Sequence, residues 1–343
     1  MKNPLVPTIA LAAAAALVLA GCVQGEGSVT DAEEPSTTTE WSSDVLNIDF
    51  ATYNPLSLII KEKGWLEEAT GGVVQVNWIQ SAGSNKANEA LRAGAIDVGS
   101  TAGSAALLAR SNGSPIQTIE VYTQPNWAAL LVPAGSSITE VSELAGKSIA
   151  ATKGTDPYFF LLQALGEAGL TLSDVNVQNL QHADGKAALE SGAVDAWAGL
   201  DPLLSTSVAT AGSVIIYDNI DFNSYGFLNA TEDFIASSPD LAQLVIDAYE
   251  KAREYAIANP EETADILAEV AAIDPSIASA VLIDRTVIDL DPVPGAKQRA
   301  VLEFIGPIFV ESGDVASQDL IDTALDSLFN TTFIEAADPS RIG

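Results

Sequence analysis

Short apolar runs alternate with amphipathic stretches along most of this chain, and that alternation restricts the fold more than any other feature of the sequence. The pattern predicts strands at 45–51, 73–80, 96–100 and 116–123, with helices at 55–68, 85–93 and 103–109 between them. The same order returns at 147–217. Strands that alternate with helices in this way form βαβ units, so we predict an α/β fold with largely parallel sheets.

The last third of the sequence differs, because expected helices follow one another there without intervening strands. They span 239–258, 260–271, 275–283, 295–312 and 318–329. Pro260 and Pro275 suit the first turns of two of these helices. A helical tail with apolar faces needs a surface to pack on, so we expect it to cover one of the α/β blocks.

One short sequence occurs twice, as LRAGAID at 91–97 and as LESGAVD at 189–195. In both copies an expected helix ends, a glycine takes the position that tolerates left-handed backbone, and a strand begins. The repeat is either a coincidence among common βα units or the mark of two similar lobes. Ligands bind beyond the carboxyl ends of the strands in open α/β sheets. Two such lobes that face each other would form a cleft.

Four polar turns follow apparent strands, and each precedes an expected helix. Free N–H groups and the helix dipole at such turns form a seat for an anion, although N-capping alone would also explain them. Aromatic side chains at the same strand ends would add apolar walls, but Trp197 also suits the core of a buried strand. The candidate ligand contacts are Tyr53, Asn54, Ser84, Asn85, Ser100, Thr101, Ala102, Gly154, Thr155, Asp156, Trp197 and Asp201.

The sequence offers little for catalysis. Its one histidine, His182, lies in a polar loop, where a solvated side chain or a local cap is the ordinary role. No Gly-x-Ser-x-Gly motif occurs, and the Gly-Lys-Ser at 146–148 lacks the upstream glycine of a phosphate-binding loop, since Val141 takes that position. The His and Cys residues form no zinc motif. We therefore expect no enzyme activity, no catalytic residue, no metal and no cofactor.

The N-terminus has the features of an export signal. An apolar run at 5–20 leads to Leu19-Ala20-Gly21-Cys22, which resembles the bacterial lipoprotein signal, in which the cysteine is lipidated. The alternative is an ordinary cleaved signal. Cys22 is the single cysteine, so the chain forms no internal disulfide. We expect a signal peptide at 1–21 and a flexible acidic tether at 22–44, which places the protein outside the cytoplasm, lipid-anchored to the bacterial cell membrane or in the periplasm.

Charge excludes two kinds of partner. The chain carries 46 Asp and Glu against 15 Lys and Arg, a formal net charge of −31. Such a field repels nucleic acid and anionic lipid surfaces, so we expect membrane contact only through the lipid anchor.

Three stretches resemble a known family. They are EALRAGAIDVGST at 89–101, GTDPYFFLLQALGEAGL at 154–170 and ADGKAALESGAVDAWAGLDP at 183–202. The chain resembles solute-binding proteins of ABC importers for aliphatic sulfonates, with relatives for taurine, nitrate and thiamine precursors. The likeness runs from about residue 45 to residue 330.

The resemblance implies a two-lobed periplasmic-binding-protein fold of type II with the ligand cleft between the lobes. Lobe one would comprise 45–124 and 225–343, with the helical C-terminal portion packed on it, and lobe two 125–224. The partners would be a small-molecule ligand and the permease and ATPase of the importer, with the protein a monomer. Carried over by position, the resemblance assigns ligand contacts to Ser84, Asn85, Ser100, Thr101, Thr155, Asp156 and Trp197.

The ligand it implies is an aliphatic sulfonate or a related small oxyanion. The alternative is a nitrogenous ligand such as taurine, another amine-bearing zwitterion or a thiamine-pyrimidine precursor. An enzyme of similar two-lobed fold, such as a porphobilinogen deaminase, uses a cysteine-linked cofactor, and Cys22 lies in the signal. A sensory domain is a third class, and no signalling module is recognisable.

The chain departs from the sulfonate binders at Thr155-Asp156-Pro157, where they carry a small polar run. Asp156 as an N-cap with Pro157 at the first helical position is the interpretation that the sequence favours. The alternative is a carboxylate that faces the cleft and pairs with a cationic group of the ligand. Asp201 is a second carboxylate near the expected cleft.

Overall fold

The computed structural model describes residues 40–343. The expected signal peptide, Cys22 and the tether as far as residue 39 lie outside the described residues. Trp41 packs partly buried against the first core, and the backbone N–H of Ser42 donates to the Asp240 carboxylate at 2.8 Å. Within 40–343, no helix combines the length and the apolar character that a membrane span requires.

The first lobe is built on a mixed sheet of six strands. Their order is β11 (Thr286–Val287), β4 (Ile116–Pro125), β10 (Gly226–Thr231), β3 (Val98–Ala102), β1 (Val45–Phe50) and β2 (Gln75–Gln80). β1 runs parallel to β2 and β3, whereas β10 runs antiparallel to both β3 and β4. The parallel part follows the predicted βαβ units, and the antiparallel part comes from a strand that the sequence pattern did not predict.

The second lobe is built on a mixed sheet of five strands. Their order is β7 (Asn176–Asn179), β6 (Ser148–Ala151), β8 (Ala196–Leu200), β5 (Ala128–Val132) and β9 (Val214–Tyr217). β6 runs parallel to β7 and β8, whereas β5 runs antiparallel to β8 and β9. β5 is a short apolar run directly after Trp127, and its antiparallel partners β8 and β9 lie far along the chain, so the sequence pattern missed it.

Within 40–343 the chain passes between the lobes twice. It leaves the first sheet at the end of β4 and enters the second at β5, and it returns between β9 and β10. These crossings are residues 125–128 and 217–226. All later elements belong to the first lobe by their sheet or by their packing.

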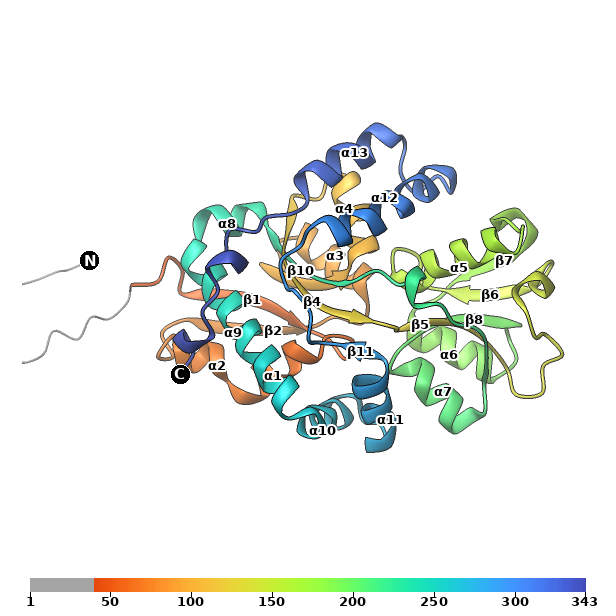
Figure 1. Ribbon diagram of the computed structural model, residues 1–343, viewed down its shortest axis with the longest axis horizontal. Coiled ribbons are helices and arrows are strands. Elements are labelled where there is room, and N and C mark those ends of the chain that lie inside the picture. Colours follow the sequence, from red (N-terminus) through yellow and green to blue (C-terminus); the bar gives the residue numbers. More distant parts are fainter. Residues whose placement is uncertain (1–39) are drawn as a thin grey trace, which may run out of the picture. The chain divides into compact units, whose positions relative to one another are not determined.

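Helices cover both faces of the first sheet (Figure 1). On one side α3 and α4 lie with α12 and α13, and on the other α1 lies with α9 and α10. Gly64, at φ 65°, divides the single helix predicted over 55–68 into two. The bounds are α1 Pro55–Lys63, α2 Trp65–Ala69, α3 Ser84–Arg92, α4 Gly103–Ser111, α8 Glu232–Ser237, α9 Pro239–Ala258, α10 Pro260–Ala271, α11 Pro275–Ser279, α12 Ala296–Glu311 and α13 Gln318–Ser327.

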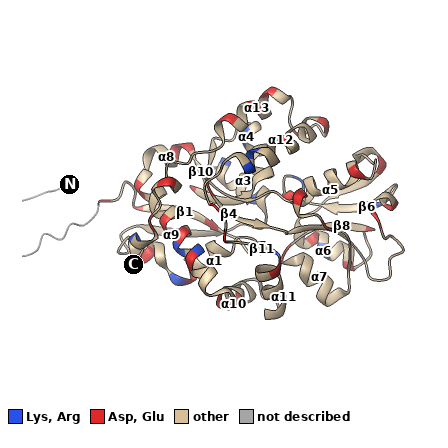
Figure 2. Cartoon of the chain, in the orientation of Figure 1, with Lys and Arg blue, Asp and Glu red and all other residues tan. Residues whose placement is uncertain are grey.

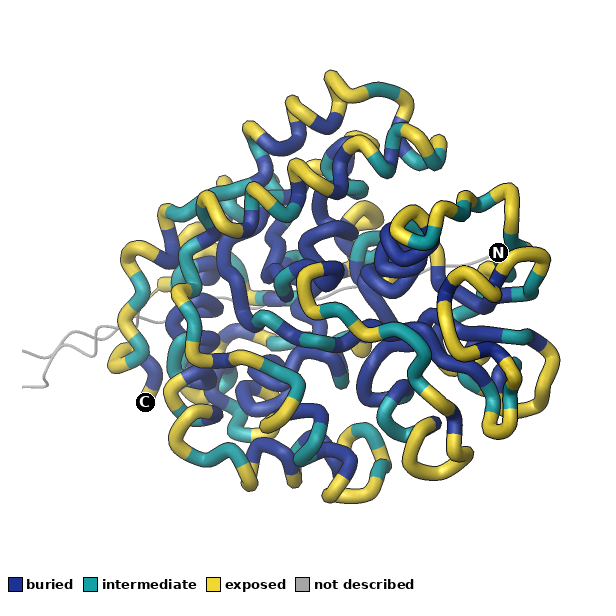
Figure 3. Tube along the Cα trace, turned by 45° about the vertical axis from the view of Figure 1, so that its right-hand side comes forward, coloured by how far each residue is buried: buried dark blue, intermediate teal, exposed yellow. Residues whose placement is uncertain are grey.

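The second lobe has three α-helices, α5 (Asp156–Glu167), α6 (His182–Glu190) and α7 (Leu203–Ala211). Short 3₁₀ turns lie at Val141–Leu144, Leu172–Asp174, Ile220–Phe222, Ile334–Ala336 and Pro339–Arg341, and a π-helical turn at Ala280–Asp284. In Figure 3 the central strands of both lobes are buried.

The helical tail packs on lobe one as predicted, but α12 also reaches lobe two. The rings of Phe159 in α5 and Phe309 in α12 lie 4.3 Å apart between centroids, and both are buried. One core cluster therefore contains residues of both lobes. The lobes are in contact on an apolar side as well as at the polar loops described next.

Candidate functional site

The side chains of the turn before α1 form their hydrogen bonds within lobe one. Asn54 caps α1, because its Oδ1 accepts the backbone N–H of Ser57 at 3.3 Å, and its Nδ2 donates to the Tyr249 hydroxyl at 3.0 Å. The Tyr53 hydroxyl donates to the carbonyl of Ser100 at 3.1 Å. The Tyr53 ring meets Trp127 edge-on, with centroids 6.0 Å apart. Tyr53 therefore lines the junction with its ring, while Asn54 acts as a structural cap.

The hydroxyls at the end of β3 are also used within lobe one. The backbone N–H and the hydroxyl of Ser100 donate to the buried Asp49 carboxylate at 2.9 and 3.1 Å. Thr101 Oγ1 accepts from Asn229 at 2.8 Å, and the Ala102 N–H donates to Ser84 Oγ at 2.9 Å. Burial raises the pKa of Asp49 to about 7, although the hydrogen bonds oppose that rise. Sequence reasoning missed Asp49, whose only signal was a charged residue within an apolar strand.

Asp156 joins the lobes and does not cap its own helix. α5 begins at Asp156 itself, after the non-capping Thr155, so the interpretation as an N-cap was wrong. Its Oδ1 accepts from the hydroxyls of Ser104, at 2.5 Å, and Ser224, at 2.7 Å. Its Oδ2 accepts from Trp127 Nε1 at 2.7 Å and from the backbone N–H of Ser224 at 2.8 Å. Burial raises the pKa of Asp156, and these hydrogen bonds oppose the rise.

A second contact joins the start of α3 to the start of α6. A Cβ on Gly83 would lie 3.0 Å from His182 Nε2 and 3.0 Å from Asn85 Oδ1, and one on Gly154 would lie 3.6 Å from the Asn85 Cβ. His182 is buried, which contradicts the expectation of a solvated loop side chain or a cap. Burial lowers its pKa to about 4, so the ring is neutral at pH 7.

The ring nitrogens of His182 have different surroundings. Nδ1 lies 3.2 Å from the Thr152 hydroxyl, which itself donates to the Leu180 carbonyl at 2.7 Å, so Nδ1 carries the proton. His182 Nε2 and Asn85 Oδ1 are buried and lack a hydrogen-bond partner among residues 40–343. Thr155 turns away, because its hydroxyl donates to the Thr152 carbonyl at 2.6 Å.

An ion pair closes a third side of the junction. Arg285, which follows α11, donates from Nε to Asp201 Oδ2 at 2.8 Å and pairs with Asp218 at 3.2 Å. Its guanidinium also donates to the carbonyl of Asn126 in the first crossing. Burial raises the pKa of Asp201, and the Arg285 charge opposes that rise. Asp201 thus lies at the junction, where the sequence placed it, but paired with a cation of lobe one.

Trp197 lies in the core of lobe two rather than at the junction. Its side chain is 0% exposed and packs in a cluster with Leu131, Leu189 and Leu204. The ring fills the space that Gly185 leaves open, since a Cβ there would lie 2.7 Å from Trp197 Nε1. The sequence allowed Trp197 to be either a wall of the pocket or a core residue, and the structure places it in the core.

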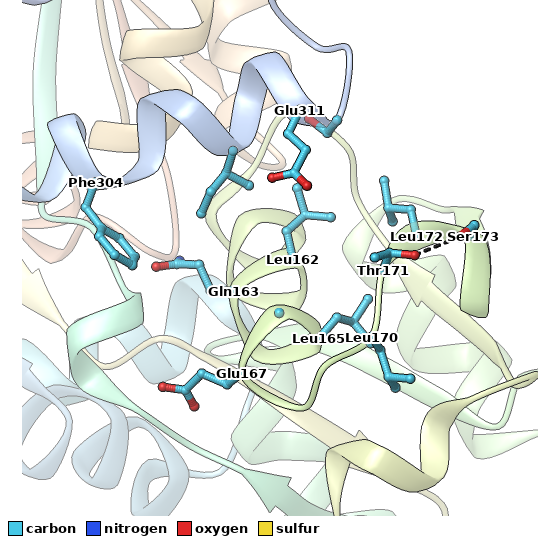
Figure 4. Close-up of a pocket in the computed structure, with 13 residues that line it drawn as sticks. Leu162, Gln163, Leu165, Glu167, Leu170, Thr171, Leu172, Ser173, Phe304 and Glu311 are labelled. Carbon is cyan, nitrogen blue, oxygen red and sulfur yellow. Dashed lines mark hydrogen bonds between the residues drawn. The ribbon is translucent and has the colours of Figure 1, made fainter.

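The cavity at the polar junction is small, and a larger one lies elsewhere between the lobes. A cavity of about 20 Å³, space for a single water, is lined by Tyr53, Trp127, Asp201 and Arg285 together with apolar neighbours. A larger one, of about 640 Å³, lies between α5 with the loop after it and α12 (Figure 4). Leucine side chains and Phe304 line much of it, and its ionisable groups are the carboxylates of Glu167 and Glu311. Because apolar side chains and two carboxylates line much of this pocket, it is a poor seat for an anion.

The junction therefore holds neutral hydrogen-bond donors and buried carboxylates. Figure 2 shows acidic residues spread over both lobes. Arg285, the basic group described at the junction, is paired with the carboxylates of Asp201 and Asp218. In the described part of the chain no cluster of His, Cys, Asp and Glu is suited to a metal ion. Most of these groups bind one another across the junction, and His182 Nε2 and Asn85 Oδ1 stay unpaired among the described residues.

Two lobes with facing strand ends, joined by two crossings, define the periplasmic binding-protein fold. An alkanesulfonate-binding protein from Xanthomonas axonopodis pv. citri, solved with bound MOPS, has this fold at a TM-score of 0.74 and 23% identity, covering 82% of this chain and 98% of that one. A periplasmic nitrate-binding protein from Synechocystis PCC 6803 matches at a TM-score of 0.71 and 14% identity, covering 88% and 91%. These likenesses confirm the predicted fold class.

Residues 56–263 match the family described as NMT1/THI5 like, and the protein belongs to that family. A relative from Escherichia coli (strain K12), named for binding aliphatic sulfonates, is 26% identical over 275 residues, which cover 80% of this chain and 86% of the relative. A Bacillus subtilis (strain 168) relative of the same name is 28% identical over 273 residues, covering 77% and 82%.

Proposed function

We propose that this protein is the extracytoplasmic solute-binding component of an ABC importer, without catalytic activity of its own. It acts as a monomer, is tethered to the membrane through a lipid on Cys22, and delivers its ligand to the permease and ATPase subunits. The two-lobed fold and the names of the relatives support this role. The charge of −31 favours a tethered protein that stays clear of anionic lipid head groups.

We propose an aliphatic sulfonate or a related small oxyanion as the ligand. One observation carries this choice: Ser104, Trp127 and Ser224 hold an anion at the lobe junction, namely the Asp156 carboxylate. Hydroxyl, indole and backbone donors also suit the oxygens of a sulfonate. The proposed contacts are these donors together with Tyr53, Asn85, Gly154 and the N–H groups at the start of α5.

A nitrogenous ligand is the second candidate, and the buried carboxylates favour it. Asp49, Asp156 and Asp201 lie in or directly below the junction, and a cationic amine placed there would gain charge-assisted hydrogen bonds. Taurine combines both chemistries, since it carries a sulfonate and an amine.

Calorimetry with ethanesulfonate, taurine and ethylamine decides between the two. An oxyanion binder takes up ethanesulfonate and taurine and rejects ethylamine. A ligand at a hundred times its Kd also stabilises the folded protein by about 2.7 kcal/mol, which raises the melting temperature. Binding of ethylamine and taurine alone would transfer the ligand class to amines. For the anchor, Cys22→Ser should release the protein from the membrane fraction, and unchanged fractionation and mass would contradict lipidation.

A further inference from the structure

The Asp156 carboxylate is fully paired although it lies between two lobes. Each of its oxygens accepts two hydrogen bonds, Oδ1 from Ser104 and Ser224 and Oδ2 from Trp127 and Ser224, at 2.5 to 2.8 Å. Asp156, Ser104, Trp127 and Ser224 are all at most 4% exposed. Four donors to one desolvated carboxylate constitute a complete anion site.

None of the four donors belongs to the helices of lobe two. Ser104 lies in the first turn of α4, and Trp127 and Ser224 lie in the two crossings between the lobes. The donors thus form a set that is independent of α5, and Asp156 is the group that α5 brings to them. Without Asp156, these buried donors would need another acceptor, because unpaired donors in the interior are costly.

Within the described chain, two further hydroxyls lie unpaired near Gly226, at the end of the second crossing. Tyr122 Oη and Thr123 Oγ1 are buried without a hydrogen-bond partner among the described residues. Both side chains border Gly226, two residues after Ser224, since a Cβ there would lie 2.4 Å from Tyr122 Cζ and 2.8 Å from Thr123 Oγ1. The two oxygens of a carboxylate are satisfied by four donors. A sulfonate has three oxygens and can accept more hydrogen bonds. The end of the second crossing therefore carries buried hydroxyls that Asp156 does not use.

We propose that Ser104, Trp127 and Ser224 form an anion-binding subsite whose resident occupant is the Asp156 carboxylate, so that an oxyanionic ligand head group binds there only by displacing Asp156. This inference rests on the proposed oxyanion ligand. The two anions need the same donors and repel each other, so they exclude one another from the subsite. Asp156 is then an intramolecular competitor that weakens oxyanion binding and selects against ligands with too few acceptor oxygens to replace it.

The test is calorimetry of ethanesulfonate binding to the full mature chain, to Asp156→Ser and to Asp156→Asn. Removal of the competitor and of its charge should tighten binding by about ten-fold or more. Asp265→Ser is the matched control, because it removes an exposed carboxylate from α10. Thermal melts establish that each variant is folded, and Asp156→Asn keeps the shape of the side chain should Asp156→Ser unfold.

Ser104→Ala separates displacement from a general charge effect. In the wild type this substitution removes a donor from Asp156 and from the ligand alike, so the affinity for ethanesulfonate should change less than three-fold. When it is combined with Asp156→Ser, the affinity should fall about ten-fold relative to Asp156→Ser alone. The Trp127 indole N–H resonance, assigned with Trp127→Phe, should shift when ethanesulfonate is added.

The outcomes separate this inference from the proposed function. Wild-type binding that Asp156→Ser leaves unchanged or weakens would overturn the inference and leave the proposed ligand class standing. A gain that Ser104→Ala does not reverse, or that Asp265→Ser reproduces, would also overturn it. Absence of ethanesulfonate binding in every folded variant would overturn both.

Discussion

The repeated sequences LRAGAID and LESGAVD form the same contact between neighbouring strands in each of the two lobes. Asp97 Oδ2 accepts the backbone N–H of Asn47 at 2.8 Å, and Asp195 Oδ2 accepts that of Ser148, also at 2.8 Å. Each aspartate thereby ties the start of one parallel strand to its neighbour, β3 to β1 and β8 to β6. The repeat thus encodes one strand tie twice.

The lobes differ two residues further on, where Gly99 of β3 corresponds to Trp197 of β8. A Cβ on Gly99 would lie 2.8 Å from Ile96 and 3.2 Å from Leu91, so these two side chains fill the space over the strand in lobe one. In lobe two the strand supplies the bulk, and Gly185 of α6 leaves room for the indole. The gap between sheet and helix is thus filled from the helix side in lobe one and from the strand side in lobe two. Trp197 therefore belongs to the core although it lies near the expected cleft.

Substitution of these two positions tests the comparison with the largest expected effect. Trp197→Ala should lower the free energy of unfolding by about 4 kcal/mol, since it leaves a large cavity. Gly99→Ala should cost about 1–2 kcal/mol, because the Ile96 methyl that it meets lies at the end of a flexible side chain. Urea unfolding measures both. A Trp197→Ala protein of normal stability that fails to bind ethanesulfonate would return Trp197 to the pocket.

The lobes also differ in how their carboxylates are satisfied. Asp49 in lobe one receives its hydrogen bonds from Ser100 of the same lobe. Asp156 in lobe two depends on groups outside that lobe, namely Ser104 and the crossings. Asp201 is shared, because its Oδ1 accepts from Ser205 of its own lobe and its Oδ2 from Arg285 of lobe one. Asp49 therefore contributes to the stability of one lobe, whereas the lobe-two carboxylates contribute to the contact between lobes.

Much of the fold follows from local sequence. Apolar periodicity and proline positions gave the bounds of α9 and α10, and the repeat indicated two related lobes. The strands β5 and β10 escaped because their pairing is antiparallel and non-local, at the crossings between lobes. No pattern in a single segment reports a partner that lies a hundred residues away.

The site was less predictable for the same reason. The turns at 83–85 and 154–156 lie close together, yet the hydroxyls of Ser84 and Thr155 serve their own lobes, and ligand contact at these turns stays a prediction. Ser104 and Arg285 were missed because their roles depend on a group of the other lobe. The direction of the Asp156 side chain could not be predicted from Asp-Pro alone, because N-capping and the observed contact share that sequence.

Asp49→Asn should have a moderate effect that depends on pH. The folded-state pKa of about 7 lies above the ordinary value of 3.8, so the folded state binds a proton more tightly. The associated stability is present below pH 4 and is lost as pH rises through 7. Asp49→Asn should thus stabilise the protein at pH 8, by about 2 kcal/mol after the loss of charged hydrogen bonds, and change little at pH 4.

Asp195→Asn is the control of opposite sign. Hydrogen bonds from Ser148 lower the pKa of Asp195, so its contribution is present above the ordinary pKa and is lost on acidification. This variant should be slightly less stable than wild type at pH 8 and equal to it at pH 3. Chemical denaturation across pH 3–8 measures both variants. A uniform effect of Asp49→Asn at all pH values would contradict a raised pKa.

A last test concerns Gly83, where lobe one lies against the His182 side chain of lobe two. Its φ is 150°, and a Cβ would meet both the His182 ring and Asn85 at 3.0 Å. Gly113 has φ 84° and open space around it, so Gly113→Ala reports the backbone strain alone, about 1 kcal/mol. Gly83→Ala should cost more in unfolding, about 1–3 kcal/mol, because φ 150° with ψ 161° is a conformation that essentially only glycine adopts. Separation of the lobes can relieve the contact with His182, but the contact with Asn85 lies within lobe one.

Separation of the lobes is the property that reports the contact of Gly83 with His182, because Gly113 has no such contact. Spin labels at Asn112→Cys in lobe one and Asn176→Cys in lobe two, in a Cys22→Ser background, report the distance between lobes. Gly83→Ala should lengthen or broaden that distance and weaken ethanesulfonate binding, since closure would no longer complete the junction, whereas Gly113→Ala should leave both unchanged. If the two variants gave the same distances, His182 and Gly83 would not limit closure, and the contact between the lobes would depend on Asp156, Arg285 and the apolar contact of Phe159 with Phe309.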